Sequence, residues 1–354
     1  MTSQPTRRLV IATDAWHPQV NGVVRVLDRL RQETPAFGLE IDVISPDGFS
    51  TVPLPTYGEI RLALCSATEV GRRIEATGAD YVHIPTEGPV GLAARRWCRR
   101  EGRGFTTSFH TRFPEYLASR LPIPPQVSYA WLRRFHNAGL VTMVSTPRLS
   151  EDLTGRGFTK TAIWPRAVDT DVFCPGEPAS LDYPGPIFMY VGRVAVEKSI
   201  EKFLELDLPG TKVVVGDGPQ RADLERRYPE AKFLGVHKGE DLVRLYRAAD
   251  VFVFPSRTDT LGLVSIEAMG CGVPVAAYPV LGPIDVIGDS GAGVCDEDLR
   301  AAALKALELP REACRERALQ FNWANSAKTF TDIVRSVNGG TGDAPAGADF
   351  AEAV

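Results

Sequence analysis

Two carboxylates and a glycine within TDTLGLVSIEAMGCGVPVAA, residues 258–277, are the first candidates for chemistry. Asp259 and Glu267 stand eight residues apart, with Gly262 between them. A glycine at the start of a helix lets backbone N–H groups approach a phosphate closely. An Asp before a helix is commonly an N-cap or turn residue, whereas Glu267 has apolar neighbours, and a buried carboxylate needs a partner. The pattern predicts two acids that hold different parts of one elongated ligand.

A basic pair comes earlier in the same half of the chain. In MYVGRVAVEKSIEKFL, residues 189–204, Arg193 follows an apolar run and Lys198 stands five residues later. An arginine fork and a lysine at the start of a helix suit a diphosphate. On this motif alone, simple surface contacts explain the two residues equally well.

The first half of the chain offers a glycine and a histidine. DAWHPQVNGVVR places Asn21 and Gly22 in the first loop after an apolar run, where a glycine lets the backbone come near a phosphate or sugar. SFHTRFPEY places His110 directly after the apolar run FTTSF. His110 has the best position of the five histidines, although a lone histidine is more often structural.

Three weaker patterns are not assigned a role. VVVGDGPQ, residues 213–220, ends a strand in a glycine turn but is not GxGxxG, so it favours a plain strand-to-helix turn. The DTD at 169–171 resembles a metal-binding DxD, but it opens a linker. The six cysteines form no CxxC pair, which argues against a zinc site or a disulfide framework. No metal and no other cofactor is therefore expected.

Short apolar, β-branched runs alternate with longer amphipathic segments along the whole chain. This alternation indicates right-handed βαβ units and parallel sheets, hence an α/β fold. Because 354 residues exceed what one core usually supports, two doubly wound domains are expected. The predicted strands are 9–13, 41–45, 80–84, 105–109, 140–145, 161–165, 187–192, 212–216, 231–235, 250–255 and 273–277.

The expected boundaries follow composition. The segments are an N-terminal domain (1–165), a Pro- and Gly-rich linker (166–186), a C-terminal domain (187–320), a last helix (321–337) and a disordered tail (338–354). A ligand shared by both domains is expected in an interdomain cleft, outside the carboxyl ends of the strands.

Charge is distributed unevenly. Residues 1–165 contain 20 basic and 15 acidic residues, whereas residues 166–354 contain 20 and 29. Arg95, Arg96, Arg99, Arg100 and Arg103 fall in one short stretch. A solvated helix face is the simpler interpretation, and a surface that meets anionic phospholipid is the sharper one. With no long apolar run or signal peptide, the chain is expected to be cytoplasmic and peripheral at the inner face of the membrane.

In this order the motifs resemble the retaining GT-B glycosyltransferases of family 4. The resemblance covers almost the whole chain, from DAWHPQVNGVVR and SFHTRFPEY through WPRAVDTDVFCPG to VGRVAVEKSIEKFL, VVVGDGPQ and the 258–277 stretch. It implies a GT-B fold of two Rossmann-like domains, the first on the acceptor side and the second binding the nucleotide-sugar, with the last helix packing back on the first domain. It also implies a metal-independent, retaining hexosyltransferase.

The resemblance also implies roles for the candidate residues. Glu267 would bind the nucleotide ribose and Asp259 the donor sugar, in the position where the family usually has Glu. Arg193 and Lys198 would clamp the diphosphate with backbone N–H groups of Gly262, Leu263 and Val264. Gly22 would lie over the donor and His110 beside the sugar, and Arg112 and Tyr116 are acceptor-side candidates. Ser199, where many members have glycine, is expected to be tolerated at a helix start.

The implied reaction moves a hexose from a nucleotide-sugar, such as UDP-glucose, to a lipid such as diacylglycerol, because several motifs look most like the branch containing sulfoquinovosyl- and glucosyl-diacylglycerol synthases. Its partners would be the donor, the lipid and an anionic membrane surface, without nucleic acid. Alternatives are a GDP-mannose-dependent enzyme acting on phosphatidylinositol or a soluble glycan, a non-catalytic sugar-nucleotide-binding protein, and a sugar-nucleotide epimerase.

Overall fold

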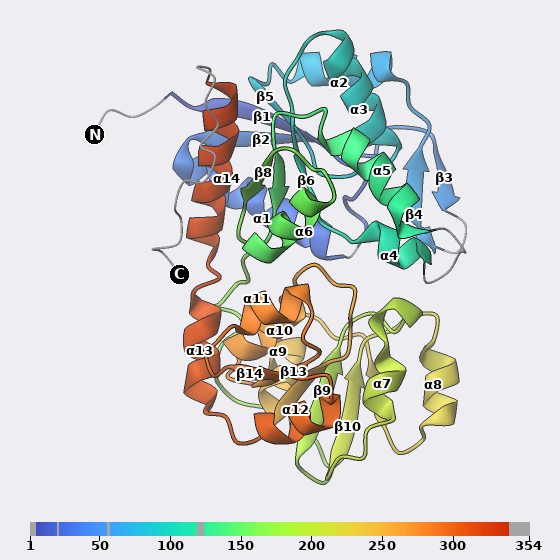
Figure 1. Ribbon diagram of the computed structural model, residues 1–354, viewed down its shortest axis with the longest axis vertical. Coiled ribbons are helices and arrows are strands. Elements are labelled where there is room, and N and C mark those ends of the chain that lie inside the picture. The colour runs from blue at the N-terminus through green and yellow to red at the C-terminus, as the bar shows by residue number, and fades with distance from the viewer. Residues whose placement is uncertain (1–4, 20, 55–56, 119–123, 340–354) are drawn as a thin grey trace. The chain divides into compact units, whose positions relative to one another are not determined.

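In the computed structural model the chain folds into two α/β units, whose helices and strands are labelled in Figure 1. The structure describes residues 5–19, 21–54, 57–118 and 124–339. The first unit comprises the described residues within Met1–Pro114, Pro122–Arg166 and Trp323–Val354, and the second those within Glu115–Leu121 and Ala167–Asn322.

The first unit is built on a six-stranded parallel sheet with the order β2-β1-β5-β6-β7-β8. Its strands are β1 (Arg7–Ala12), β2 (Leu39–Ile44), β5 (Tyr81–Ile84), β6 (Thr106–Ser108), β7 (Thr142–Val144) and β8 (Thr161–Ile163). The helices of this part of the chain are α1 (Gly22–Glu33), η1 (Thr34–Phe37), α2 (Ala67–Ala76), α3 (Pro89–Arg100), α4 (Phe113–Ala118), α5 (Pro125–His136), α6 (Pro147–Gly155) and α14 (Trp323–Asn338).

The second unit repeats the architecture with the strand order β11-β10-β9-β12-β13-β14, also parallel. Its strands are β9 (Ile187–Val191), β10 (Thr211–Val215), β11 (Lys232–Gly235), β12 (Val251–Phe254), β13 (Val275–Ala277) and β14 (Gly293–Cys295). Its helices are η2 (Val196–Lys198), α7 (Ile200–Leu204), α8 (Arg221–Arg227), α9 (Gly239–Ala248), α10 (Leu263–Gly270), α11 (Leu281–Ile287), α12 (Leu299–Ala306) and α13 (Arg311–Leu319).

Burial on both faces explains the apolar runs. In β9, Met189 and Val191 enter one core cluster while Phe188 and Tyr190 enter the other, so alternate side chains fill opposite faces of the sheet. Parallel strands covered by helices on both faces read as continuous apolar sequence. This is why each of the eleven predicted strands is present, with ends within two residues of the prediction.

Three strands were not predicted. β3 (Thr51–Leu54) and β4 (Tyr57–Ala63) form an antiparallel pair outside the main sheets, and β14 has only three residues. Pro53 lies within β3, and a proline normally argues against a strand because it cannot donate to the ladder. Short, mixed sequences of this kind carry little periodicity.

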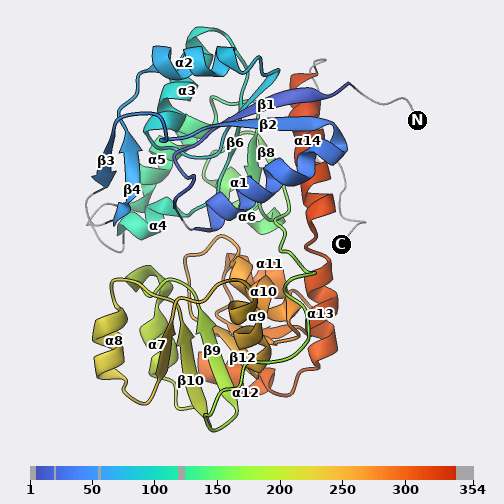
Figure 2. The same cartoon turned by 180° about the vertical axis from the view of Figure 1, so that it is seen from behind.

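The last helix returns to the first unit. The helix predicted over 321–337 is present as α14 (Trp323–Asn338), and a separate helix, α13 (Arg311–Leu319), precedes it. Trp164 donates through Nε1 to Ser326 Oγ at 3.0 Å, and Phe330 packs on the Trp164 ring with centroids 4.8 Å apart. Figure 2 shows α14 beside α1, with which it is in contact. Of the disordered tail predicted over 338–354, Asn338 is the last residue of α14, and residues 340–354 lie outside the described residues.

The predicted linker falls within the second unit from Ala167 onward. Phe173 is buried in that unit's core, and Leu181 and Tyr183 pack against it. The amide of Val168 donates to the carbonyl of Phe321. The stretch is therefore held by apolar contacts and a backbone hydrogen bond within the unit.

Candidate functional site

The second unit brings its candidate residues to one edge of the sheet. β9 is the first strand of the series, with β10 on one side and β12 on the other, so the connections leave β9 and β12 in opposite directions. Ligands of doubly wound sheets bind at such a switch point, outside the carboxyl ends of the strands. Arg193 and Lys198 follow β9, and Asp259 and Gly262 follow β12.

Lys198 and Asp259 contact each other directly. Lys198 Nζ donates to Asp259 Oδ1 at 2.5 Å, and both side chains are largely buried, at 20% and 16% exposure. The Thr258 hydroxyl donates to the Glu197 carbonyl at 3.2 Å, a second link between the two loops. The sequence predicted the lysine for a diphosphate and the acid for a sugar, and here the two form one ion pair.

Gly262 is required at its position for two reasons. Its φ of 84° lies in the left-handed region, and a Cβ built on it would come within 2.8 Å of Phe254 Cζ. It precedes α10, whose start has no side-chain cap and no acidic residue in the first turn. The N–H groups of Leu263 and Val264 thus start a helix whose positive end favours an anion.

Glu267 lies inside α10 and is 3% exposed. The Tyr246 hydroxyl, from α9, donates to Glu267 Oε2 at 2.9 Å, which supplies a partner for the buried carboxylate. Tyr246 was not singled out from the sequence. The sequence indicated that a buried Glu267 would need a partner. It did not indicate which residue, because Tyr246 lies 21 positions away on another helix.

Arg193 and Ser199 show how the loop after β9 is shaped. The Tyr190 hydroxyl donates to the Arg193 carbonyl at 2.9 Å, which fixes the backbone just beyond the strand. Ser199 has φ 52° and ψ 36° and is the one non-glycine residue with positive φ in the described part of the chain. The serine expected to be easily tolerated is therefore in a conformation that glycine favours.

Ser199→Gly is expected to stabilise the protein. Left-handed backbone costs a non-glycine residue about 1–2 kcal/mol, partly offset by the greater unfolded-state freedom of glycine, so we expect a net gain of about 0.5–1 kcal/mol. Thermal unfolding would register it as a higher midpoint. Ser199→Ala is the matched control: it removes the hydroxyl without relieving the backbone, and an equal gain there would contradict this reason.

The first unit places its candidates along its own sheet edge. Its switch point lies between β1 and β5, because β2 flanks β1 on the other side. Asn21 caps α1, accepting from the Val24 amide at 3.0 Å, and Gly22 is the exposed first residue of that helix. His110 follows β6, the neighbour of β5.

Asp14, which the sequence did not single out, organises this edge. Its carboxylate accepts from the amides of Val90 and Gly91 at 2.8 and 3.2 Å and from the Thr86 hydroxyl at 3.0 Å. It therefore ties the end of β1 to the start of α3. Burial raises the pKa of the Asp14 carboxyl, against these hydrogen bonds.

His110 is held beside a buried cation. Arg166 Nη2 donates to His110 Nδ1 at 3.4 Å, and the guanidinium carbon lies 3.8 Å from the centre of the Trp164 ring. Because a guanidinium only donates, Nδ1 must accept and the imidazole proton is on Nε2. Burial lowers the pKa of His110 well below its usual value, and the charges of Arg166, His83 and His136 lower it further. His110 is therefore neutral, with Nε2 as its donor.

Arg166 is itself 5% exposed, and burial lowers its pKa to about 9, still above neutrality. Without the Arg166 donor, His110 can carry its proton on either ring nitrogen. We therefore expect ¹⁵N spectra of Arg166→Met to show a mixture of the Nδ1–H and Nε2–H tautomers in place of the single Nε2–H form. Arg166→Lys keeps a cationic donor and is the comparison. A single Nε2–H form in the Met variant would show that Arg166 does not set the tautomer.

The two acceptor-side candidates are Arg112, which directly precedes α4, and Tyr116, which lies within it. Arg112 Nη2 lies 4.0 Å from Asp152 Oδ2 on α6, with its side chain mostly buried. Tyr116 belongs to α4, and its side chain lies outside the described residues. His83 and His136 are core residues: His83 bonds to Thr106 and Ser108, and burial lowers its pKa to about 3.

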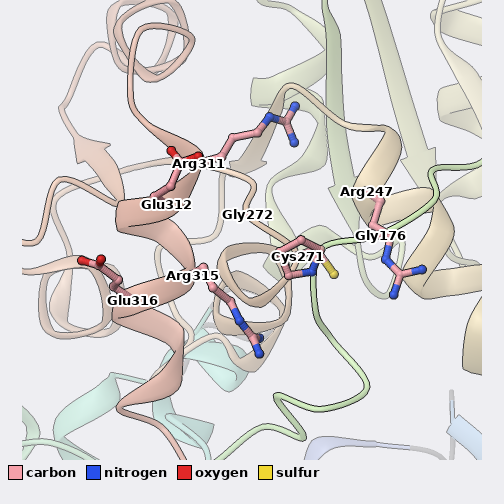
Figure 3. Close-up of a pocket in the computed structure, with 9 residues that line it drawn as sticks. Gly176, Arg247, Cys271, Gly272, Arg311, Glu312, Arg315 and Glu316 are labelled. Atoms are coloured by element: carbon pink, nitrogen blue, oxygen red, sulfur yellow. The ribbon is translucent and has the colours of Figure 1, made fainter.

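A cavity of about 500 Å³ lies at the other end of α10, beside Cys271 (Figure 3). Three arginines that line this cavity donate hydrogen bonds to backbone carbonyls. Arg247 donates to the Cys174 carbonyl, Arg311 to the Ala249 carbonyl, and Arg315 to the Phe173 carbonyl. Within the ranges that the structure describes, no group of three or more His, Cys, Asp or Glu residues could hold a metal.

Comparison with known proteins identifies the class. Residues 20–172 match the family model described as "Glycosyltransferase Family 4", and residues 185–311 match "Glycosyl transferases group 1". Among solved structures, sucrose-phosphate synthase from Thermosynechococcus elongatus superposes with a TM-score of 0.73 at 20% identity, covering 96% of this chain and all of that one. The structure of Anabaena HepE, in complex with UDP and glucose, superposes with a TM-score of 0.69 at 13% identity. The match covers 93% of this chain and all of that one.

Two sequence relatives are more similar. The sulfoquinovosyl transferase SQD2 of Arabidopsis thaliana is 30% identical over 275 residues, which cover 70% of this chain and 52% of the relative. This chain thus matches about half the length of the plant relative. A GDP-mannose-dependent alpha-mannosyltransferase of Mycobacterium tuberculosis is 29% identical over 310 residues, 79% of this chain and 81% of that one.

Two parallel six-stranded sheets, together with these structural neighbours, define the GT-B fold. The chain belongs to glycosyltransferase family 4, and it is a hexosyltransferase enzyme.

Proposed function

We propose that the protein transfers a hexose from a UDP-sugar to a lipid such as diacylglycerol, with retention at the anomeric carbon. The observation that carries the donor site is the grouping of Arg193, Lys198 and the uncapped start of α10 at the β9–β12 switch point. Two cations and a helix N-terminus suit a diphosphate. Glu267 takes the ribose hydroxyls and Asp259 the donor sugar.

In the proposed reaction the bond between the anomeric carbon and the diphosphate oxygen breaks as the acceptor oxygen bonds to the same face of that carbon. The acceptor proton passes to the departing phosphate. Negative charge grows on the leaving group, where Arg193, Lys198 and the N–H groups of Leu263 and Val264 stabilise it. These cations take the place of a metal, so transfer should persist in EDTA.

His110 is proposed to act beside the donor sugar as a neutral donor. Its Nδ1 already accepts from Arg166, which leaves Nε2–H to donate to a hydroxyl of the sugar. Because burial holds its pKa low, His110 is unsuited to taking up a second proton at neutral pH. Gly22 is proposed to lie over the donor, and Arg112 and Tyr116 on the acceptor side.

The lipid acceptor is supported by the similarity to a sulfoquinovosyl transferase. An anionic membrane surface, met at the inner face of the membrane, is supported by the net positive charge of residues 1–165 and the arginines from Arg95 to Arg103. No helix of the described residues is long and apolar enough to cross a membrane.

A GDP-mannose donor is the second candidate. Four-fifths of the length of a GDP-mannose-dependent alpha-mannosyltransferase matches this chain, and a relative with 26% identity is a phosphatidylinositol dimannoside mannosyltransferase.

A screen of UDP- and GDP-sugars against a lipid extract, with products identified by mass spectrometry, tests the proposal. We expect a glycosylated neutral lipid from a UDP-sugar, and calorimetry should show tighter binding of UDP than of GDP. A product formed only from GDP-mannose, or nucleotide-sugar isomers without an acceptor, would contradict it.

A further inference from the structure

α3 and α5 of the first unit enclose a basic groove, which we call the α3/α5 groove. The two helices lie side by side in Figure 1 and are joined by Arg95, which donates to the carbonyls of Phe135 at 3.1 Å and Arg134 at 2.7 Å. The groove has a volume of about 330 Å³. Its lining includes Arg95, Arg96, Arg99, Trp131, Arg134 and Phe135.

The groove is strongly basic, with four arginines in its lining. Across the part of the chain that the structure describes, no carboxylate pairs with Arg96, Arg99 or Arg134, while Glu101 pairs with Arg100. Burial lowers the pKa of Arg95, and Arg99, Arg134 and Arg96 lower it further, as expected for cations that crowd one another. Such a cluster attracts an anionic partner, which would offset its repulsion.

Apolar side chains border the same arginines. Val127 and Trp131, one helical turn apart on α5, are 62% and 43% exposed, and Arg134 follows three residues later. The other side of the helix, with Tyr129 and Leu132, is buried, and the buried Phe135 ring lies 6.2 Å from the Trp131 ring, centroid to centroid. A helix with exposed aliphatic and indole groups beside arginines has the character of one that lies in a lipid interface.

We propose that the α3/α5 groove binds the phosphate headgroups of an anionic phospholipid surface, with Trp131 and Val127 entering the interfacial layer. A soluble phosphate would explain the arginines but not the exposed apolar pair. The inference rests on the proposed function for its lipid acceptor, and it assigns the membrane contact to particular residues. Its test uses binding rather than transfer.

Vesicle sedimentation tests it with two charge-matched triple variants. In Arg96→Gln/Arg99→Gln/Arg134→Gln the groove loses three charges, and in Arg226→Gln/Arg227→Gln/Arg300→Gln the second unit loses three exposed ones. At about 1 kcal/mol per arginine, the groove variant should partition onto phosphatidylglycerol vesicles on the order of 100-fold more weakly. The control should bind as the wild type does, and thermal midpoints would verify that both are folded.

Trp131→Ala separates insertion from charge. Binding should fall roughly tenfold, and the ratio to wild type should persist at high salt, where electrostatic attraction is screened. Three results would overturn the inference. They are an equal loss of vesicle binding in the two triple variants, wild-type binding to phosphatidylcholine vesicles as strong as to phosphatidylglycerol vesicles, and wild-type vesicle binding by Trp131→Ala. Vesicle binding that survives while no lipid is glycosylated would instead count against the proposed function alone.

Discussion

Replacing Lys198 by methionine is expected to lower kcat/KM for sugar transfer about 10²–10³-fold, the usual loss when one preorganised group that stabilises a leaving oxyanion is removed. The ammonium is fixed by Asp259 at 2.5 Å and lies beyond β9, at the edge where α10 starts. Methionine keeps much of the length of the chain but not its charge. Steady-state kinetics with saturating acceptor would measure the loss.

Lys202→Met is the matched control. Lys202 lies on α7, one turn beyond, pairs with Glu205 at 2.9 Å and is solvent-exposed, so its loss should leave kcat/KM unchanged. If Lys198→Met retained wild-type kcat/KM, the proposal that this lysine stabilises the leaving group would be wrong. If both variants lost activity equally, the effect would reflect overall charge.

Glu267→Gln is expected to weaken nucleotide binding by about 10–100-fold, since a hydrogen bond to a charged group contributes about 1.5–3 kcal/mol. The amide keeps the shape of the side chain, and its oxygen can still accept from the Tyr246 hydroxyl, so the fold should survive. The ribose hydroxyls, however, lose an anionic acceptor. Calorimetry with UDP would measure the change in Kd.

Tyr246→Phe completes this test. It removes the 2.9 Å hydrogen bond to Glu267 but leaves the carboxylate, so we expect a smaller, roughly three- to tenfold loss of affinity. Unchanged UDP affinity in Glu267→Gln would exclude this acid as the ribose ligand. A larger loss in Tyr246→Phe than in Glu267→Gln would show that the tyrosine, rather than the acid, governs binding.

The sheets could be predicted because their chemistry is local. IFMYV in β9 is apolar at every position since both faces of the sheet are buried, and that is legible in a single sequence. β3 was missed because it contains a proline, and β14 because GVC begins with a glycine and is only partly buried. The return of α14 to the first unit depends on Trp164 and Ser326, which are 162 residues apart in sequence.

The candidate donor site was predicted as a set of residues but not as a set of contacts. The order of the motifs indicated Lys198, Asp259 and Glu267 as site residues. The Lys198–Asp259 ion pair, however, joins residues 61 positions apart, and it forms only because β9 and β12 are adjacent in the sheet. The position of Ser199 shows a similar limit. A departure from a glycine pattern was visible, but its backbone angle required the structure.

A crystal structure with bound UDP-hexose tests the central claim most directly. The account predicts that the diphosphate lies within hydrogen-bond distance of the Leu263 and Val264 amides and of Lys198 Nζ, with the ribose on Glu267. A diphosphate bound elsewhere, with the Lys198–Asp259 contact unchanged and Glu267 remote from the ribose, would contradict it.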